Sequence, residues 1–189
     1  MRTKITFKWL EDVDACEDGV EYYKTLGETD LFRLIERGIE DSELDYCNWL
    51  IARCMDHKQA LRYALYAAES VLHMYEDAYP DDNRPRMAIE AVKAVIKRDS
   101  KKNRDSADVE SCKAYDAFYS LCGRINNAAS LAAYVAGSVA GVGYDQTSVE
   151  AIAKGSANAF YYYTGSLSCI DDQMTRILRH GIKMIKGEI

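Results

Sequence analysis

Apolar residues recur every three or four positions along most of this chain, and that spacing places them on one face of an α-helix. The clearest stretch is 57–79, whose apolar face contains Ala60, Ala64, Ala67, Ala68, Val71, Leu72 and Tyr75. Only 2 prolines interrupt the 189 residues, and runs of alternating β-branched residues, which are typical of strands, are few. The sequence therefore predicts an all-α fold.

Capping and helix-ending residues divide this pattern into about seven or eight helices joined by short turns. The expected helices cover 14–26, 29–37, 42–54, 57–79, 85–97, 107–121 with the small-residue tract that follows it, 147–163 and 167–186. Ser42 and Asp56 are expected to cap the third and fourth helices, and the polar run 97–106 is expected to be an exposed, mobile loop. A chain of this length is typical of one domain, so residues 1–189 are predicted to form a single helical bundle.

Small residues follow one another at a spacing of four in the tract 128–143. Ala129, Ala133, Gly137 and Gly141 leave one helix face nearly free of side chains, so another helix can approach its backbone closely. That neighbour is either a helix of the same chain or a second copy, in which case a homo-oligomer forms through Ala133, Gly137 and Gly141.

Charge is distributed unevenly, because residues 1–90 carry 20 Asp and Glu against 11 Lys and Arg within a net charge of −6. This acidic half argues against direct binding of nucleic acid and favours a basic partner. The tract 128–143 is shorter than the ~20 apolar residues of a membrane-spanning helix, and Lys4 and Lys8 interrupt what would be a signal peptide. A cytoplasmic protein without a membrane segment is expected.

Sequence signatures of catalysis are missing from the chain. It contains no phosphate-binding loop, no strand-borne G-x-G-x-x-G, no G-x-S-x-G and no H-E-x-x-H, and its 6 cysteines form no C-x-x-C pair. His57, His73 and His180 lie on separate predicted helices. We therefore predict no catalytic residues, no cofactor and no metal site.

The densest polar cluster is D-D-N-R-P-R at 81–86, which includes Asp81, Asp82, Asn83, Arg84 and Arg86. Its first interpretation is a structural clamp, in which an acidic or amide side chain caps the next helix and an arginine pairs with a carboxylate of a neighbouring helix. Its second is direct recognition of an anionic ligand or of a carboxylate on a partner. An enzyme pocket around the two arginines is a third and weaker alternative.

Tyrosine is abundant, with 14 in the chain, and Tyr161, Tyr162 and Tyr163 are consecutive. Three consecutive residues point in different directions around a helix, so at least one of these rings should be exposed. Because exposed tyrosines are common in protein interfaces, the run is a candidate interface.

Four blocks of the chain carry a resemblance to a known family. They are A-C-E-D-G-V-E-Y (15–22), N-W-L-I-A-R (48–53, with Trp49), Q-A-L-R-Y-A-L-Y-A-A-E-S-V-L (59–72) and D-D-N-R-P-R-M-A-I-E-A (81–91). Over about residues 10–97 the chain resembles an immunity protein family of helical proteins found beside bacterial toxin genes and in bacteriophages. The half from 105 to 189, rich in small residues and tyrosine, is similar only in composition.

The resemblance implies a non-enzymatic protein-binding inhibitor, with Trp49 and the 81–86 cluster as candidate partner or clamp residues. Its target would be a toxin, as for an immunity protein, or a host defence system inhibited by a phage protein. The alternative is a structural or accessory module that oligomerises through the small-residue face.

Overall fold

The computed structural model describes residues 2–121, 127–141 and 146–189, and ten α-helices lie within them. They are α1 (Phe7–Asp12), α2 (Glu17–Leu26), α3 (Leu31–Glu40), α4 (Leu44–Cys54), α5 (His57–Ala78), α6 (Arg84–Lys97), α7 (Lys101–Ser120), α8 (Ala128–Ala140), α9 (Gln146–Thr164) and α10 (Ser168–Lys186). The predicted all-α single domain is confirmed. The number of helices exceeds the prediction.

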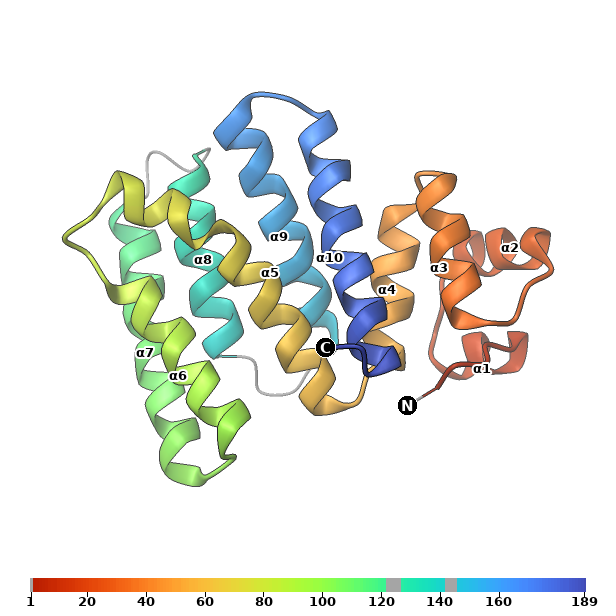
Figure 1. Cartoon of the computed structure of the whole chain (residues 1–189), viewed down its shortest axis with the longest axis horizontal. Helices are drawn as coiled ribbons and strands as arrows, with labels where there is room; N and C mark the ends of the chain where they lie inside the picture. Colours follow the sequence, from red (N-terminus) through yellow and green to blue (C-terminus); the bar gives the residue numbers. More distant parts are fainter. Residues whose placement is uncertain (1, 122–126, 142–145) are drawn as a thin grey trace.

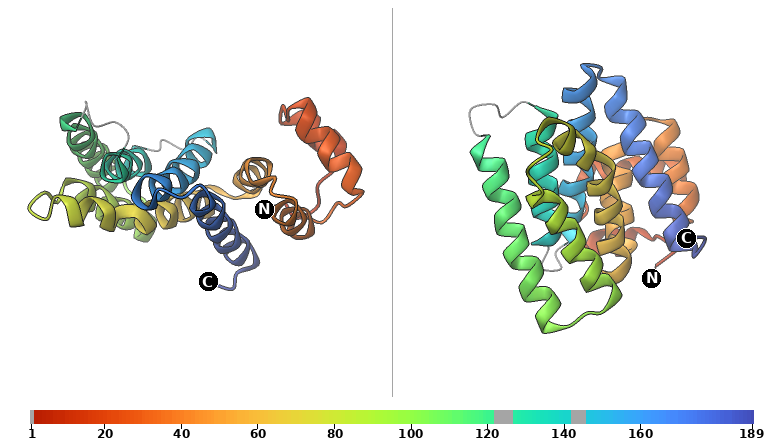
Figure 2. Two further views of the ribbon diagram at one scale, coloured as in Figure 1. Left: turned by 90° about the horizontal axis from the view of Figure 1, so that it is seen from above. Right: turned by 60° about the vertical axis from the view of Figure 1, so that its left-hand side comes forward.

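The long helix α5 lies in the middle of the molecule and packs against α6, α8, α9 and α10 (Figure 1). Helices α6 and α7 form one end of the long axis, and α1 and α2 form the other, as the view from above also shows (Figure 2). The helix stripes identified in the sequence meet in one continuous core, which includes Tyr63, Leu72, Ile89, Ile152 and Ile177. This arrangement places α4 and α9 next to each other although about 100 residues separate them.

The start of α5 follows the sequence prediction. The Asp56 carboxylate accepts a hydrogen bond of 2.9 Å from the Gln59 amide, and the Gln59 side chain accepts one of 3.0 Å from the Asp56 amide. This reciprocal pair is a capping box, which satisfies two backbone amides that the first helical turn leaves unpaired. The cap expected at Ser42 is wrong, because Ser42 adopts a φ of 62° and belongs to the turn that ends α3.

Two further boundaries differ from the prediction. The expected loop 97–106 is mostly helical, because Ser100 caps α7 by accepting a hydrogen bond from the Asn103 amide. The Asn103 side chain also donates to the carbonyls of Ala94 and Arg98 at the end of α6. Helix α1 was not predicted, since six residues are too few to show a helical period.

The small-residue face of α8 packs against α7 of the same chain. The Ser111 hydroxyl donates a hydrogen bond of 2.8 Å to the Gly137 carbonyl, and a Cβ atom at position 137 would lie 3.3 Å from the Ser111 carbonyl oxygen and from the Tyr115 ring. The close helix approach that the spacing predicts is therefore present. Ala133 and Gly137 are buried, and α7 contacts the face at Gly137 and Gly141, so a homo-oligomer through Ala133, Gly137 and Gly141 would first require α7 to separate from α8.

Among the helices of the described ranges, none has the length and apolar character needed to cross a membrane. The five cysteines in these ranges are free thiols, and Cys122 lies outside them. Burial raises the pKa of the Cys47 and Cys54 thiols to about 12, so both remain protonated at neutral pH.

Candidate functional site

The D-D-N-R-P-R cluster forms the junction between α5 and α6, and Asp82 is its centre. The Tyr75 hydroxyl donates a 2.6 Å hydrogen bond to the Asp82 carboxylate, and the Arg84 guanidinium donates to the same carboxylate at 2.6 and 2.9 Å. These interactions, of which the one with Arg84 is the strongest, hold the pKa of Asp82 well below its usual range. The carboxylate therefore stays ionised and paired at neutral pH.

Arg86 makes the connection between the two helices. Its Nε and Nη2 atoms each donate a 2.7 Å hydrogen bond to the Glu76 carboxylate on α5. Asn83 occupies the cap position of α6 without a side-chain cap hydrogen bond, and Asp81 is exposed. Of the two arginines, Arg86 thus reaches the neighbouring helix and Arg84 pairs within its own turn, an arrangement that favours the clamp hypothesis over ligand recognition.

We predict that Arg86→Ala lowers the free energy of unfolding by about 1 kcal/mol. Two charge-assisted hydrogen bonds are lost, but the pair is partly exposed, 43% for Arg86 and 34% for Glu76, so solvent reduces the effect. Urea unfolding measures the change, with Arg62→Ala on the exposed face of α5 as the control, for which we expect less than about 0.5 kcal/mol. A variant that keeps the wild-type stability and loses partner binding would contradict the clamp hypothesis.

The tyrosine run lies in the last turns of α9. Tyr162 and Tyr163 are exposed and Tyr161 is half-buried. The rings of Tyr161 and Tyr162 pack edge to face at 5.1 Å between centroids, and the Tyr163 ring approaches His73 of α5 at 5.8 Å. The rings are thus accessible to a partner, and their role as an interface stays a prediction.

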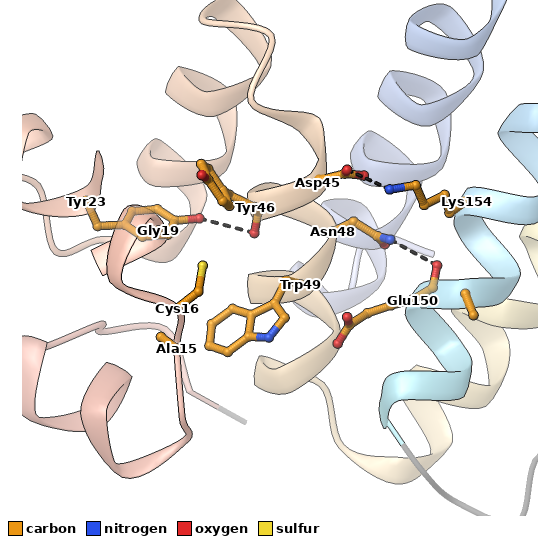
Figure 3. Close-up of a pocket in the computed structure, with 11 residues that line it drawn as sticks. Ala15, Cys16, Gly19, Tyr23, Asp45, Tyr46, Asn48, Trp49, Glu150 and Lys154 are labelled. Carbon is orange, nitrogen blue, oxygen red and sulfur yellow. Dashed lines mark hydrogen bonds and ion pairs between the residues drawn. The ribbon is translucent and has the colours of Figure 1, made fainter. Parts of the chain in front are cut away.

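A groove with an apolar lining lies between α2, α4 and α9 (Figure 3). It has a volume of about 380 Å³ and a mostly apolar lining. The Trp49 ring lies between α2 and α9 and forms the floor (Figure 3). Other lining residues are Ala15, Cys16 and Gly19 from the α2 side and Ala151 from α9.

Hydrogen bonds and an ion pair fix the floor of this groove. The Asn48 side chain donates a 3.1 Å hydrogen bond to the Glu150 carbonyl of α9 and accepts one of 3.0 Å from the buried Tyr63 hydroxyl. The Arg53 guanidinium pairs with the Glu150 carboxylate and lies 4.3 Å from the centroid of the Trp49 ring. These polar contacts join α4 to α9 at the floor of the groove and hold the Trp49 ring in place.

A second hollow of about 270 Å³ adjoins the groove, and the two share Asp45 and Lys154 as lining residues. The Lys154 ammonium and the Asp45 carboxylate form an ion pair of 2.6 Å at the boundary, as Figure 3 shows. Glu43 and Asp171 also line the second hollow. The combined surface is apolar at one end and carries carboxylates at the other.

The groove was not predicted as a site, and Trp49 is the one lining residue that was predicted from the sequence as a candidate partner or clamp residue. Its walls come from residues 15–23, 45–49 and 150–154, and no periodic pattern connects segments so far apart. The sequence does contain one related signal. Residues 11–45 hold 13 Asp and Glu against 3 Lys and Arg, and this acidic segment forms the α2 side of the groove.

In the described residues, no group of three or more His, Cys, Asp or Glu side chains is arranged to hold a metal ion.

Comparison with known proteins gives one family match. The family described as "Imm-5 like putative immunity protein" matches residues 51–115, which comprise the end of α4, all of α5 and α6, and most of α7. The resemblance to an immunity protein family is confirmed for this segment, which includes the D-D-N-R-P-R junction. No curated protein and no solved structure gives a significant match.

Proposed function

We propose that this protein is a non-enzymatic immunity protein, which binds a protein toxin and neutralises it by stoichiometric contact. The observation that carries the proposal is the match of residues 51–115 to an immunity protein family. An inhibitor of this kind needs a stable scaffold and an accessible recognition surface, and it needs no reacting groups. The protein would act in the cytoplasm, where its target must be intercepted.

The matched segment and the recognition surface are different parts of the molecule in this proposal. Helices α5, α6 and α7 form the scaffold that is similar to the family. The groove is built by α2, α9 and the first part of α4, which lie outside residues 51–115. We infer that the scaffold is shared with the family and that partner choice depends on the surrounding helices.

Two classes of target agree with an inhibitory role, a bacterial toxin or an enzyme of a host defence system inhibited by a phage protein. The family description favours the toxin. The structural or accessory role through the small-residue face of α8 is less favoured, because α7 covers Gly137 and Ala133 is also buried.

Co-expression in bacteria tests the proposal. Each product of the genes adjacent to this one is induced alone and together with the protein, and growth is recorded. We expect one neighbouring product to arrest growth and this protein to restore it. If the protein restores growth against none of them and instead relieves a phage-defence system, the anti-defence function is correct; self-association without either effect would favour the accessory module.

A further inference from the structure

We propose that the Trp49 groove, defined by Ala15, Gly19, Trp49, Asp45, Ala151 and Lys154, binds a basic segment of the partner protein through one large apolar side chain flanked by lysine or arginine. This inference rests on the proposed function, in that the occupant is a protein. It adds the location of the contact and the chemistry of the bound segment.

The shape and lining of the groove fit a large apolar side chain. Its volume of about 380 Å³ and its apolar lining are of the kind in which aromatic or aliphatic anchors give most of the binding energy of an interface. Gly19 helps to leave the groove open, because a Cβ atom there would lie 3.1 Å from the Cys16 Sγ and 3.6 Å from the Tyr46 ring. The floor is already ordered by the contacts of Arg53 and Asn48, so little conformational entropy is lost when a partner binds.

The charge around the groove selects a basic occupant. The segment 11–45 has a net charge of −10, from 13 acidic and 3 basic residues, while the whole chain has −6. Tyr46 lies on the wall of the groove. Partial burial of its ring is the largest cause that raises the pKa of its phenol, and the nearby negative charges of Asp18, Glu43 and Asp45 raise it further. A positive segment would therefore be attracted to this end of the molecule, and an acidic one would be repelled.

The ion pair at the boundary of the two hollows provides a place for an incoming cation. Lys154 and Asp45 are 56% and 67% exposed, and an ion pair this exposed contributes little to stability. A lysine or arginine of the partner can therefore replace Lys154 at the Asp45 carboxylate at little energetic cost. In the two sets of lining residues that the structure describes, Lys154 is the one cation, beside Glu43, Asp45, Glu150 and Asp171.

Selection of peptides tests the groove without knowledge of the partner. Random 12-residue peptides displayed on phage are selected on the wild-type protein, and the enriched peptides are then titrated at low salt. The test variant is Ala151→Arg, which places a bulky cation at an exposed position of the groove lining. The matched control is Ala94→Arg, at an exposed position of α6 outside the groove.

We expect the enriched peptides to be basic and to contain an aromatic or large aliphatic residue. Their affinity should fall at least about tenfold for Ala151→Arg, which corresponds to about 1.4 kcal/mol, and should be unchanged for Ala94→Arg. Asp45→Asn, which removes one exposed carboxylate, should weaken binding several-fold at low salt. This second variant keeps the test valid if Ala151→Arg fails to fold.

The inference is overturned if no peptide is enriched, if the enriched peptides are acidic, or if they bind Ala151→Arg and Asp45→Asn as tightly as the wild type. Its failure differs from failure of the proposed function. If Ala151→Arg neutralises a toxin at wild-type efficiency, the groove is not the binding site for the toxin, and the proposed immunity function still stands. If the groove binds basic peptides and the protein neutralises no toxin, the groove is a binding site and the proposed immunity function is wrong.

Discussion

Replacing Asn48 by leucine is expected to lower the free energy of unfolding by about 2–4 kcal/mol. The Asn48 amide is buried, and it accepts a hydrogen bond from the Tyr63 hydroxyl and donates one to the Glu150 carbonyl. Leucine has a similar size but leaves the fully buried Tyr63 hydroxyl without its acceptor, and such an unsatisfied group contributes about 1–3 kcal/mol of destabilisation. The loss of the Asn48 hydrogen bond to the Glu150 carbonyl adds about 1 kcal/mol. Chemical denaturation followed by circular dichroism measures the change.

A double-mutant cycle with Tyr63→Phe isolates the buried hydroxyl. Tyr63→Phe removes the donor and leaves the Asn48 oxygen unpaired, so it should also destabilise the protein. In the double variant both members of the Tyr63–Asn48 pair are apolar, which can be nearly neutral. We therefore expect the double variant to be at least about 1 kcal/mol more stable than additivity predicts. Strict additivity would mean that this hydrogen bond does not connect α4 and α5 as described.

Replacing Gly38 by alanine is expected to lower the free energy of unfolding by about 1–2 kcal/mol. Gly38 lies in α3 where that helix approaches α4, and a Cβ atom there would overlap the buried Sγ of Cys47. Overpacking of this kind destabilises by about 1–3 kcal/mol, which exceeds the gain of about 1 kcal/mol that alanine has over glycine within a helix. Thermal or urea unfolding gives the comparison.

Cys47→Ala provides the matched rescue. Alone it removes one buried sulfur atom and should lower stability by about 1 kcal/mol, as similar small deletions do. Combined with Gly38→Ala it creates the space that the new methyl group needs, so the double variant should lie within about 1 kcal/mol of the wild type. A double variant that is less stable than either single variant would show that the two helices are not in the contact described.

Local signals in the sequence predicted those parts of the fold that depend on neighbours along the chain. The cap at Asp56, the start of α6 next to Pro85 and the close approach at Gly137 each follow from one or two residues with a specific backbone role. The start of α7 was mispredicted because its first turns have no apolar stripe. The run from Lys101 is polar throughout, and Ser100 and the Lys101–Asp105 ion pair carry a helical signal without an apolar stripe.

The candidate site depends on contacts between distant segments, so local sequence patterns could not predict it. Which of Arg84 and Arg86 pairs with the neighbouring helix depends on the positions of two carboxylates. Glu76 lies in the last turn of α5 and Asp82 lies in the turn that follows it. The groove brings Gly19, Trp49 and Ala151 together from three separate helices. Composition alone indicated its chemistry, through the acidic segment 11–45.

Titration of a purified toxin shows whether the protein inhibits by stoichiometric binding. The toxin is the neighbouring gene product whose growth arrest this protein relieves, and its activity is measured at a fixed concentration as the protein is added. We expect activity to fall linearly and to reach zero at one equivalent, with a 1:1 complex by calorimetry. Loss of toxin activity at far less than one equivalent, increasing with time, would show catalytic inactivation and exclude stoichiometric inhibition.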